Sequence, residues 1–383
     1  MGAYVSIPFC ATHYGVTLDC SPPNSTDSAI GGITRGSFAA DPDIAGIGIL
    51  AAFTAVTSFA LLLSTISVLW WFSKYIFGWK SRLPEHEKSS QEHRFNITDL
   101  LETLVLSCSD QQVFTGAAYA ITLRYLKGCN ISAYHYNIVA NMLLLTCATH
   151  LGAVTVARNY WRYPLVALLR IVVTVGVYLA TGLLLSNQGA VAAGFPTEVP
   201  PANATDSLMI LSAACFQTDA SHLATTIAHS LSGTDALRDA LVDSDPGNKI
   251  HGWNHYLAML FFFALTILVE FGRFTQRAIP TLPSFRPPAR IVRVLDGVFA
   301  VYLLAGMAIS WWTVVDSVAY MSRLRGWVHG SGWMQLDGGL NPEDDPTTFG
   351  QLVPMLLVVL TVFTFVQIVS GKMFSAPLMF SEI

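Results

Sequence analysis

The sequence predicts an all-α fold, a seven-transmembrane helix bundle with its N-terminus lumenal or outside and its C-terminus cytosolic. Three observations support this prediction. The 383-residue chain is 52% hydrophobic. Only 12% of its residues are charged, about half of the ~25% found in soluble proteins. Seven long apolar runs follow one another, and Lys and Arg concentrate in the connections on one side of them.

The apolar runs also predict the domain organisation. Residues 1–42 are polar and turn-rich, and they precede a membrane domain over residues 43–371. Each run is long enough to cross a hydrocarbon core of about 30 Å. We expect residues 186–250 to form a lumenal loop and residues 372–383 a cytosolic tail. The seven predicted spans are residues 44–72, 98–126, 133–157, 163–185, 252–272, 291–320 and 349–370.

The first two spans carry local signals that support a helical assignment. Gly46-x-Gly48-x-x-Ala51 resembles a nucleotide-binding loop, but no strand precedes it, so it indicates close helix packing. Thr98 suits the N-cap of the second helix, which we expect to continue through Asp110 to about Tyr125.

The orientation follows from the positive charges in the connections, because cytosolic loops carry an excess of Lys and Arg. The connections after the first, third and fifth runs, together with the C-terminal tail, hold most of them, and we assign these segments to the cytosol. These residues are Lys74, Lys80, Arg82, Lys88, Arg94, Arg158, Arg162, Arg273, Arg277, Arg286, Arg290, Arg293 and Lys372.

Cysteines and glycosylation sequons agree with this orientation. The sequons at Asn24 and Asn203 fall in lumenal segments and are our expected glycosylation sites. Four cysteines also fall on that oxidising side, which allows one or two disulfides: Cys10, Cys20, Cys129 and Cys215. The cysteine spacing does not suggest a metal site, and we expect no metal and no cofactor. The chain also lacks a basic tract of the kind that binds nucleic acid.

The stretch Ser107–Gly116 is the most unusual part of the chain. It places Asp110, Gln111 and Gln112 inside the second predicted span, with apolar sequence on both sides. A carboxylate inside a bilayer is costly and is a functional-site hypothesis by default.

Other ionisable side chains fall at the same predicted depth, in the cytosolic half of the bundle. They are His150, Arg170, Glu270, Asp296 and Glu102. Structural interpretations stand beside the functional one: Glu270 precedes two arginines at an interface, and Asp296 follows Arg293 by three residues. Arg170 would neutralise a buried acid, and a lone His150 would be a hydrogen-bonded core histidine.

A second polar cluster lies near the lumenal face and indicates packing more than chemistry. It comprises Arg124, Tyr134, His135, Tyr136, Asn137 and Asn141, with Asp316 as a rival site late in the sixth span. Glu343-Asp344-Asp345 precedes the seventh helix, where carboxylates favour a helix N-terminus, and it does not have the form of a diphosphate-binding motif.

Several stretches resemble a family of filamentous-fungal polytopic membrane proteins, which includes the membrane-bound terpene cyclases of ascochlorin and ascofuranone meroterpenoid biosynthesis. The resemblance covers most of the chain. The stretches are Pro42-Asp-Ile-Ala-Gly-Ile-Gly48, Ser109-Asp-Gln-Gln-Val-Phe-Thr-Gly116, Cys129-Asn-Ile-Ser-Ala-Tyr-His-Tyr-Asn-Ile-Val139, Thr149-His150-Leu151 and Phe349-Gly-Gln-Leu-Val-Pro354.

The resemblance implies a cyclase that protonates and closes the epoxidised farnesyl chain of a prenylated aromatic polyketide. Such a reaction needs a protonated acid, and burial keeps a carboxyl group protonated by raising its pKa. We expect Asp110, His150 and Glu270 to be catalytic, with Glu270 or Glu102 the better acid if Arg170 touches Asp110. Residues expected to bind substrate are Gln111, Gln112, Arg170, Phe114, Tyr119, Tyr178 and Phe262.

The expected partners are the lipophilic prenylated aromatic substrate, membrane lipid and pathway enzymes such as a P450 epoxidase. The expected location is the endoplasmic reticulum membrane. A proton-coupled transporter is the alternative, since intramembrane Asp, Glu, His and Arg also suit a proton relay. A receptor-like protein is less favoured, because the sequence has neither Asp-Arg-Tyr after the third span nor Asn-Pro-x-x-Tyr in the seventh. A non-enzymatic scaffold is a further alternative.

Overall fold

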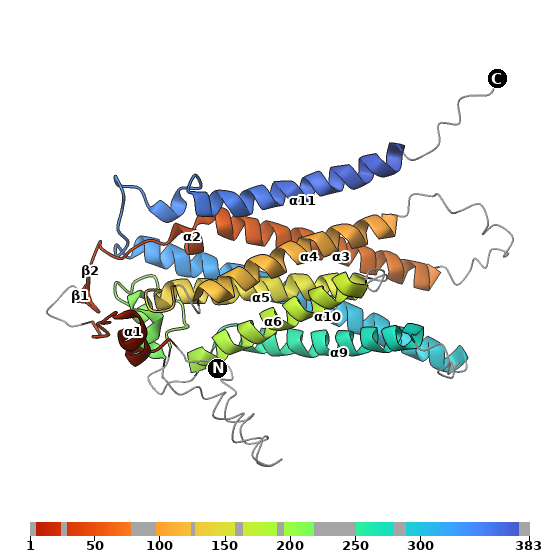
Figure 1. Cartoon of the computed structure of the whole chain (residues 1–383), viewed down its shortest axis with the longest axis horizontal. Helices are drawn as coiled ribbons and strands as arrows, with labels where there is room; N and C mark the ends of the chain where they lie inside the picture. The colour runs from red at the N-terminus through yellow and green to blue at the C-terminus, as the bar shows by residue number, and fades with distance from the viewer. Residues whose placement is uncertain are drawn as a thin grey trace, which may run out of the picture.

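Long helices running side by side form the body of the protein (Figure 1). The computed structural model describes residues 5–23, 29–77, 97–123, 127–157, 164–189, 195–217, 250–278 and 289–374. Each predicted span corresponds to one long helix. These helices are α3 (Ile47–Phe77), α4 (Ile97–Ile121), α5 (Ala133–Val156), α6 (Pro164–Gly189), α9 (Trp253–Ala278), α10 (Ala289–Gly330) and α11 (Phe349–Phe374).

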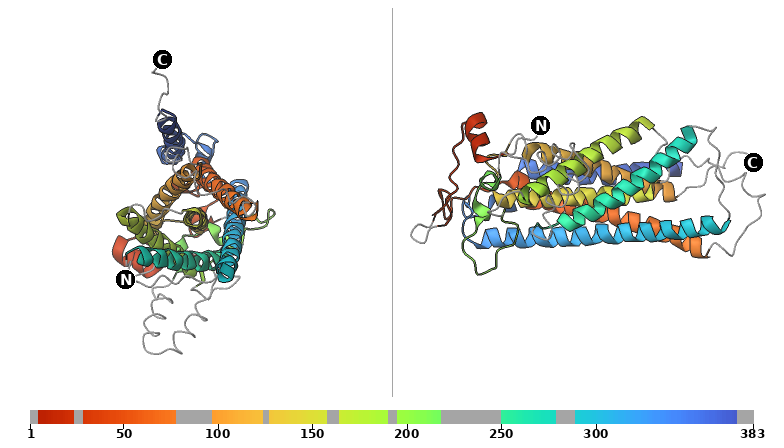
Figure 2. Two further views of the ribbon diagram at one scale, coloured as in Figure 1. Left: turned by 90° about the vertical axis from the view of Figure 1, so that its right-hand side faces the viewer. Right: turned by 90° about the horizontal axis from the view of Figure 1, so that it is seen from below.

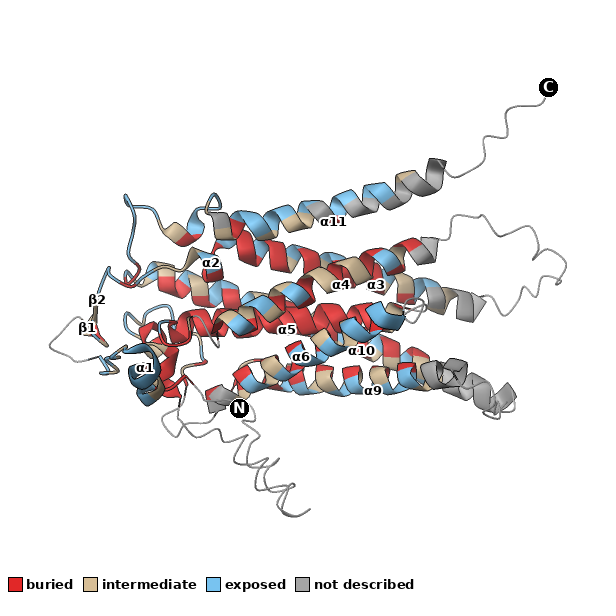
Figure 3. Cartoon of the chain, viewed as in Figure 1, coloured by how far each residue is buried: buried red, intermediate tan, exposed pale blue. Residues whose placement is uncertain are grey.

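Helix α5 lies at the centre of the bundle and determines its architecture. It packs against α3, α4, α6, α9 and α10, and an end-on view shows these helices around it (Figure 2). Every residue from Ala133 to Val154 is buried (Figure 3). Helix α11 lies outside this ring and packs against α3 and α4. The core is therefore the shell of side chains around α5.

Short elements form a cap over one end of the bundle (Figure 1). Strands β1 and β2 pair in antiparallel register, with Ala29 opposite Thr34. The short elements are α1 (Ile7–Tyr14), β1 (Ala29–Ile30), β2 (Ile33–Thr34), α2 (Pro42–Ala45), η5 (Leu208–Ile210), η6 (Ala213–Phe216) and η8 (Pro342–Asp344).

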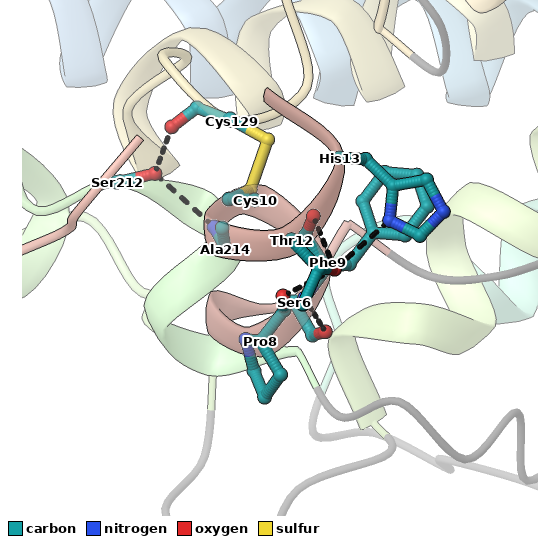
Figure 4. The surroundings of a disulfide bond; sticks show 9 residues. All are labelled: Ser6, Pro8, Phe9, Cys10, Thr12, His13, Cys129, Ser212 and Ala214. Carbon is teal, nitrogen blue, oxygen red and sulfur yellow. Dashed lines mark hydrogen bonds between the residues drawn. A yellow bond between two sulfur atoms is a disulfide. The ribbon is translucent and has the colours of Figure 1, made fainter. Parts of the chain in front are cut away.

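Two disulfides hold this cap together. Cys10 pairs with Cys129, and Cys20 pairs with Cys215, so all four cysteines assigned to the lumenal side are bonded. Around the first bond, the Ser212 hydroxyl donates to the carbonyl of Cys129 at 2.9 Å (Figure 4). Since the sequence separations are 119 and 195 residues, each bond connects the N-terminal segment with a distant part of the chain.

Among the residues that the structure describes, five helical segments are long and apolar enough to cross a membrane, which by length and composition indicates an integral membrane protein. They are Pro42–Trp70, Ala133–Val156, Pro164–Ser186, Trp253–Gly272 and Gly297–Gly330. Helix α6 faces outward with large apolar side chains such as Leu165, Val172 and Leu179, as lipid contact requires.

Two predicted spans are helices that fall outside this set. Helix α4, predicted as the span 98–126, carries Glu102, Asp110 and two amides, and these lower its hydropathy. For α11, predicted as the span 349–370, the apolar segment among the described residues is Gly350–Phe363. Helix α10 continues past the predicted span end at residue 320 to Gly330, and Leu324 and Val328 in this extension are buried.

The glycines Gly46 and Gly48 allow α11 to pack closely against the start of α3. The amide oxygen of Gln351 accepts a hydrogen bond from the Gly48 nitrogen at 2.8 Å. A Cβ atom on Gly46 would lie 2.2 Å from the carbonyl oxygen of Pro42 and 2.3 Å from Cδ of Gln351. The glycine pair therefore serves helix packing, as the sequence indicates.

We predict that Gly46→Ala destabilises the protein by about 1–3 kcal/mol, the usual cost of overpacking. The backbone at Pro42 and the Gln351 side chain both have to move. Thermal unfolding in detergent measures the effect. Gly326→Ala is the matched control, because its Cβ meets nothing within 4 Å and we expect no loss there. Equal melting temperatures for the two variants would contradict the packing argument.

Candidate functional site

Asp110 on α4 and Arg170 on α6 form an ion pair between these two helices. The guanidinium donates through Nε to Oδ1 at 2.7 Å and through Nη2 to Oδ2 at 2.6 Å. The Asp110 side chain is 31% exposed and that of Arg170 24%. A bidentate pair of this kind is the strong arrangement of a guanidinium with an ionised carboxylate. Asp110 is therefore held as an ion-pair partner.

His150 on α5 lies directly behind this pair. Its Nδ1 atom is 2.7 Å from the hydroxyl of Ser109 on α4 and 3.3 Å from the hydroxyl of Thr174 on α6. The ring is 2% exposed and meets the edge of Phe263 on α9. Three of the predicted residues, Asp110, His150 and Arg170, are thus brought together. Helices α4 and α6 pack against α5, and the three residues lie at the same level along these helices.

A groove opens between α4 and α6 above the ion pair. Phe114 and Leu169 on its rim are exposed on the outer, lipid-facing surface of the bundle. The groove combines an apolar wall with one pair of opposite charges, which suits an amphipathic molecule that arrives through the membrane. It is lined by Asp110, Val113, Phe114, Val166, Leu169, Arg170, Val173 and Thr174.

The amides beside Asp110 bond to other helices. Gln111 accepts a hydrogen bond from the Thr361 hydroxyl on α11 at 2.7 Å. Gln112 donates to the carbonyl of Phe53 on α3 at 3.1 Å. These hydrogen bonds hold α4 against its neighbours, whereas the carboxylate of Asp110 is bonded by Arg170.

Three other residues expected to bind substrate do not line the groove. Tyr119 donates to the carbonyl of Asp43 near the cap. Tyr178 is buried, donates to the carbonyl of Cys147 and stacks on Phe263. Phe262 stacks on Tyr302, between α9 and α10. Of the predicted aromatic residues, Phe114 alone belongs to the lining.

The remaining predicted residues are placed as follows. Glu270 on α9 is 4% exposed, and Glu102 on α4 is also buried. Asn203 is exposed in the segment 195–217. The side chains of Asn24, Arg124 and Asp296 lie outside the described residues.

The buried carboxylate of Glu343 is a site that the sequence did not identify. It accepts hydrogen bonds from the His135 ring at 3.0 Å, the Tyr134 hydroxyl at 3.0 Å and the His329 ring at 3.3 Å. Burial alone would raise its pKa, but these hydrogen bonds outweigh burial and lower the pKa to about 2. This ionised carboxylate joins the cap to α5 and α10.

Asp316 on α10 forms a second cluster at the same end of the bundle. One of its oxygens, Oδ2, lies 3.0 Å from the His251 ring and 3.3 Å from the His255 ring. His251 stacks on Tyr320. The three side chains bond to each other, and in the part of the chain that the structure describes no group of His, Cys, Asp and Glu is arranged to hold a metal ion.

The sequence does not indicate the Glu343 network, because its members come from distant segments. Tyr134 and His135 stand in the lumenal polar cluster, and Glu343 in an acidic loop, but nothing in either pattern links them across more than 200 residues. Two further members of the lumenal cluster bond to neighbouring segments: Tyr136 donates to the carbonyl of Leu184 and Asn137 to that of Pro196.

Comparison with known proteins gives no match: no family model, no curated protein and no solved structure is similar to this chain.

We predict that Asp110→Asn and Arg170→Gln each destabilise the protein by about 1–3 kcal/mol, because each removes the ion-pair partner of a partly buried charge. The double variant removes both charges and recovers most of the loss, so the two effects are strongly non-additive. Thermal unfolding of the three variants in lipid nanodiscs measures this. Additive losses would show that the pair is not a coupled unit.

We also predict that Glu343 makes stability depend on acid pH. Its folded pKa, about 2, lies below the ordinary value of 4.5, so its stabilising effect is complete above pH 4.5 and is lost as the pH falls toward 2. The difference corresponds to about 3 kcal/mol. Thermal unfolding at pH 6 and pH 3 should show a loss of about 2 kcal/mol, because pH 3 is still above the folded pKa. Glu343→Gln should weaken this pH dependence, whereas Glu198→Gln at an exposed site should preserve it.

Proposed function

We propose that the chain is a membrane-bound terpene cyclase of the ascofuranone and ascochlorin type, which closes the epoxidised farnesyl chain of a prenylated aromatic polyketide. The observation that carries this proposal is the lipid-facing groove between α4 and α6, with Asp110 and Arg170 in its lining and His150 behind it. The apolar wall suits a farnesyl chain, and the ion pair suits the oxygen atoms of the aromatic ring. The substrate class itself comes from the resemblance to the fungal family.

The roles follow from the contacts of each acid. Asp110 is engaged by Arg170 through both oxygens, so this pair binds the polar ring of the substrate. Glu270 is then the better proton donor, as a carboxyl group buried in the bundle. It protonates the epoxide oxygen, the C–O bond opens, and the resulting cation is captured by the double bonds of the chain. A base takes the last proton, so the product is an isomer of the substrate.

We further propose seven spans, a lumenal N-terminus, a cytosolic C-terminus and a location in the endoplasmic reticulum. Helices at all seven predicted positions support the number of spans. Both disulfides and the exposed sequon at Asn203 belong to the capped end, which is expected of an oxidising compartment. Lys and Arg concentrate in the connections at the opposite end.

The test uses microsomes from a host that expresses the full chain, supplied with the epoxidised prenylated arene. We expect a product of unchanged mass, and Glu270→Gln should lower its rate by about 10²–10⁴-fold, the range for loss of a general acid. Asp337→Asn, at an exposed acid of the cap, is the control and should keep full turnover. Failure of the unmodified chain to isomerise the substrate beyond empty microsomes would refute the cyclase proposal.

A proton-coupled transporter is the second candidate, because charged groups paired inside the bundle also suit proton movement. Proteoliposomes containing the protein distinguish the two functions. Ligand uptake that is coupled to a pH change, without isomerisation, would favour transport.

A further inference from the structure

The hydrogen bonds around His150 determine which atom of its ring is offered to a ligand. Two hydroxyl groups from two different helices, those of Ser109 and Thr174, meet the same ring nitrogen, Nδ1. The ring is buried, and Thr174 also lines the groove. The imidazole therefore stands immediately behind the groove wall.

The two hydroxyl groups differ from most of their neighbours. Buried threonines in this bundle commonly donate to the carbonyl four residues earlier: Thr149 bonds to Leu145 and Thr181 to Val177, both at 2.8 Å. Within the described residues, the side chains of Ser109 and Thr174 bond to His150 alone. If Nδ1 carried the ring proton, both hydroxyl hydrogens would be buried without an acceptor. If Nδ1 is an acceptor, its single lone pair takes the Ser109 hydrogen at 2.7 Å and is shared with the longer Thr174 contact at 3.3 Å, so fewer hydrogens are left without an acceptor.

This comparison places the ring proton on the other nitrogen, Nε2, which is buried and has no hydrogen-bond partner among the described residues. A buried polar atom without a partner costs about 1–3 kcal/mol, so such an atom points to a ligand. Arg170 lies one helical turn before Thr174, and its positive charge disfavours a second one on the nearby ring. His150 is accordingly neutral.

We propose that Ser109 and Thr174 are positioning residues that hold His150 as the neutral imidazole with its proton on Nε2. The Nε2–H group, on the far side of the ring from the two hydroxyls, is then the donor for a ligand oxygen of the epoxide, carbonyl or phenol class that reaches past the groove wall into the bundle. The identity of that ligand rests on the proposed function. This assigns His150 to oxygen binding during ring closure, where the sequence alone suggested a proton acceptor.

The first test is independent of enzymatic activity. Nitrogen NMR of ¹⁵N-histidine-labelled protein in nanodiscs distinguishes the two neutral forms of the ring, and loss of a signal in His150→Gln identifies His150. We expect a protonated Nε2 and a bare Nδ1 at neutral pH. In Ser109→Ala combined with Thr174→Val, the signal should shift toward a mixture of the two forms. A protonated Nδ1 in the unmodified protein, whether neutral or imidazolium, would overturn the proposal.

The second test is turnover in microsomes. Ser109→Ala should lower the rate by about a hundredfold, the scale expected for a displaced catalytic group, and Ser109→Thr, which keeps the hydroxyl, should restore most of it. Ser310→Ala is the matched control: it removes a buried hydroxyl that bonds only to the carbonyl of Gly306 in its own helix. Unchanged turnover in Ser109→Ala would refute the positioning role.

The two tests separate this inference from the proposed function. If unmodified microsomes give no isomer but NMR finds the proton on Nε2, the cyclase proposal fails and the assignment of the His150 ring stands. If turnover occurs but Nδ1 is protonated, the cyclase proposal stands and this inference fails.

Discussion

The structure depends on the complete burial of α5. A helix surrounded by other helices cannot leave polar side chains to water, so they need hydrogen-bond partners in their own helix or in a neighbouring element. Tyr136 therefore bonds to α6 and Thr149 contacts Thr57 on α3, with 3.1 Å between their hydroxyl groups. Apolar packing between helices depends only on how well their surfaces fit together. These hydrogen bonds add directional contacts and help to determine how the outer helices are placed around α5.

The candidate site arises where this constraint meets the lipid-facing surface. His150 belongs to the buried helix, whereas Asp110 and Arg170 belong to the two outer helices that meet in front of it. An ion pair at this position draws α4 and α6 together while the groove above it stays apolar. The same contacts thus stabilise the bundle and gather acid, cation and imidazole at one depth, and for this reason stability and function have to be measured separately.

The sequence predicted the features that depend on depth and composition. The helices, the four bonded cysteines and the convergence of Asp110, His150 and Arg170 all follow from apolar runs and their orientation. It did not predict features that depend on rotation of a helix about its axis. Gln111 and Gln112 are adjacent in sequence but bond to α11 and α3 respectively, because successive residues point about 100° apart. The Glu343 network was not predicted, because its members meet only through the position of the loop that carries Glu343.

Helix α5 also connects the two polar clusters physically. His135 at its capped end and His150 near its other end are separated by about 22 Å along the axis and by about 60° around it. A rotation of α5 that broke the bond from His135 to Glu343 would turn His150 by the same angle, away from Ser109 and Thr174. The ionised Glu343, held by His135, His329 and Tyr134, is therefore one of the contacts along α5 that favour the present rotation, together with the bonds of Tyr136 to α6 and Thr149 to α3.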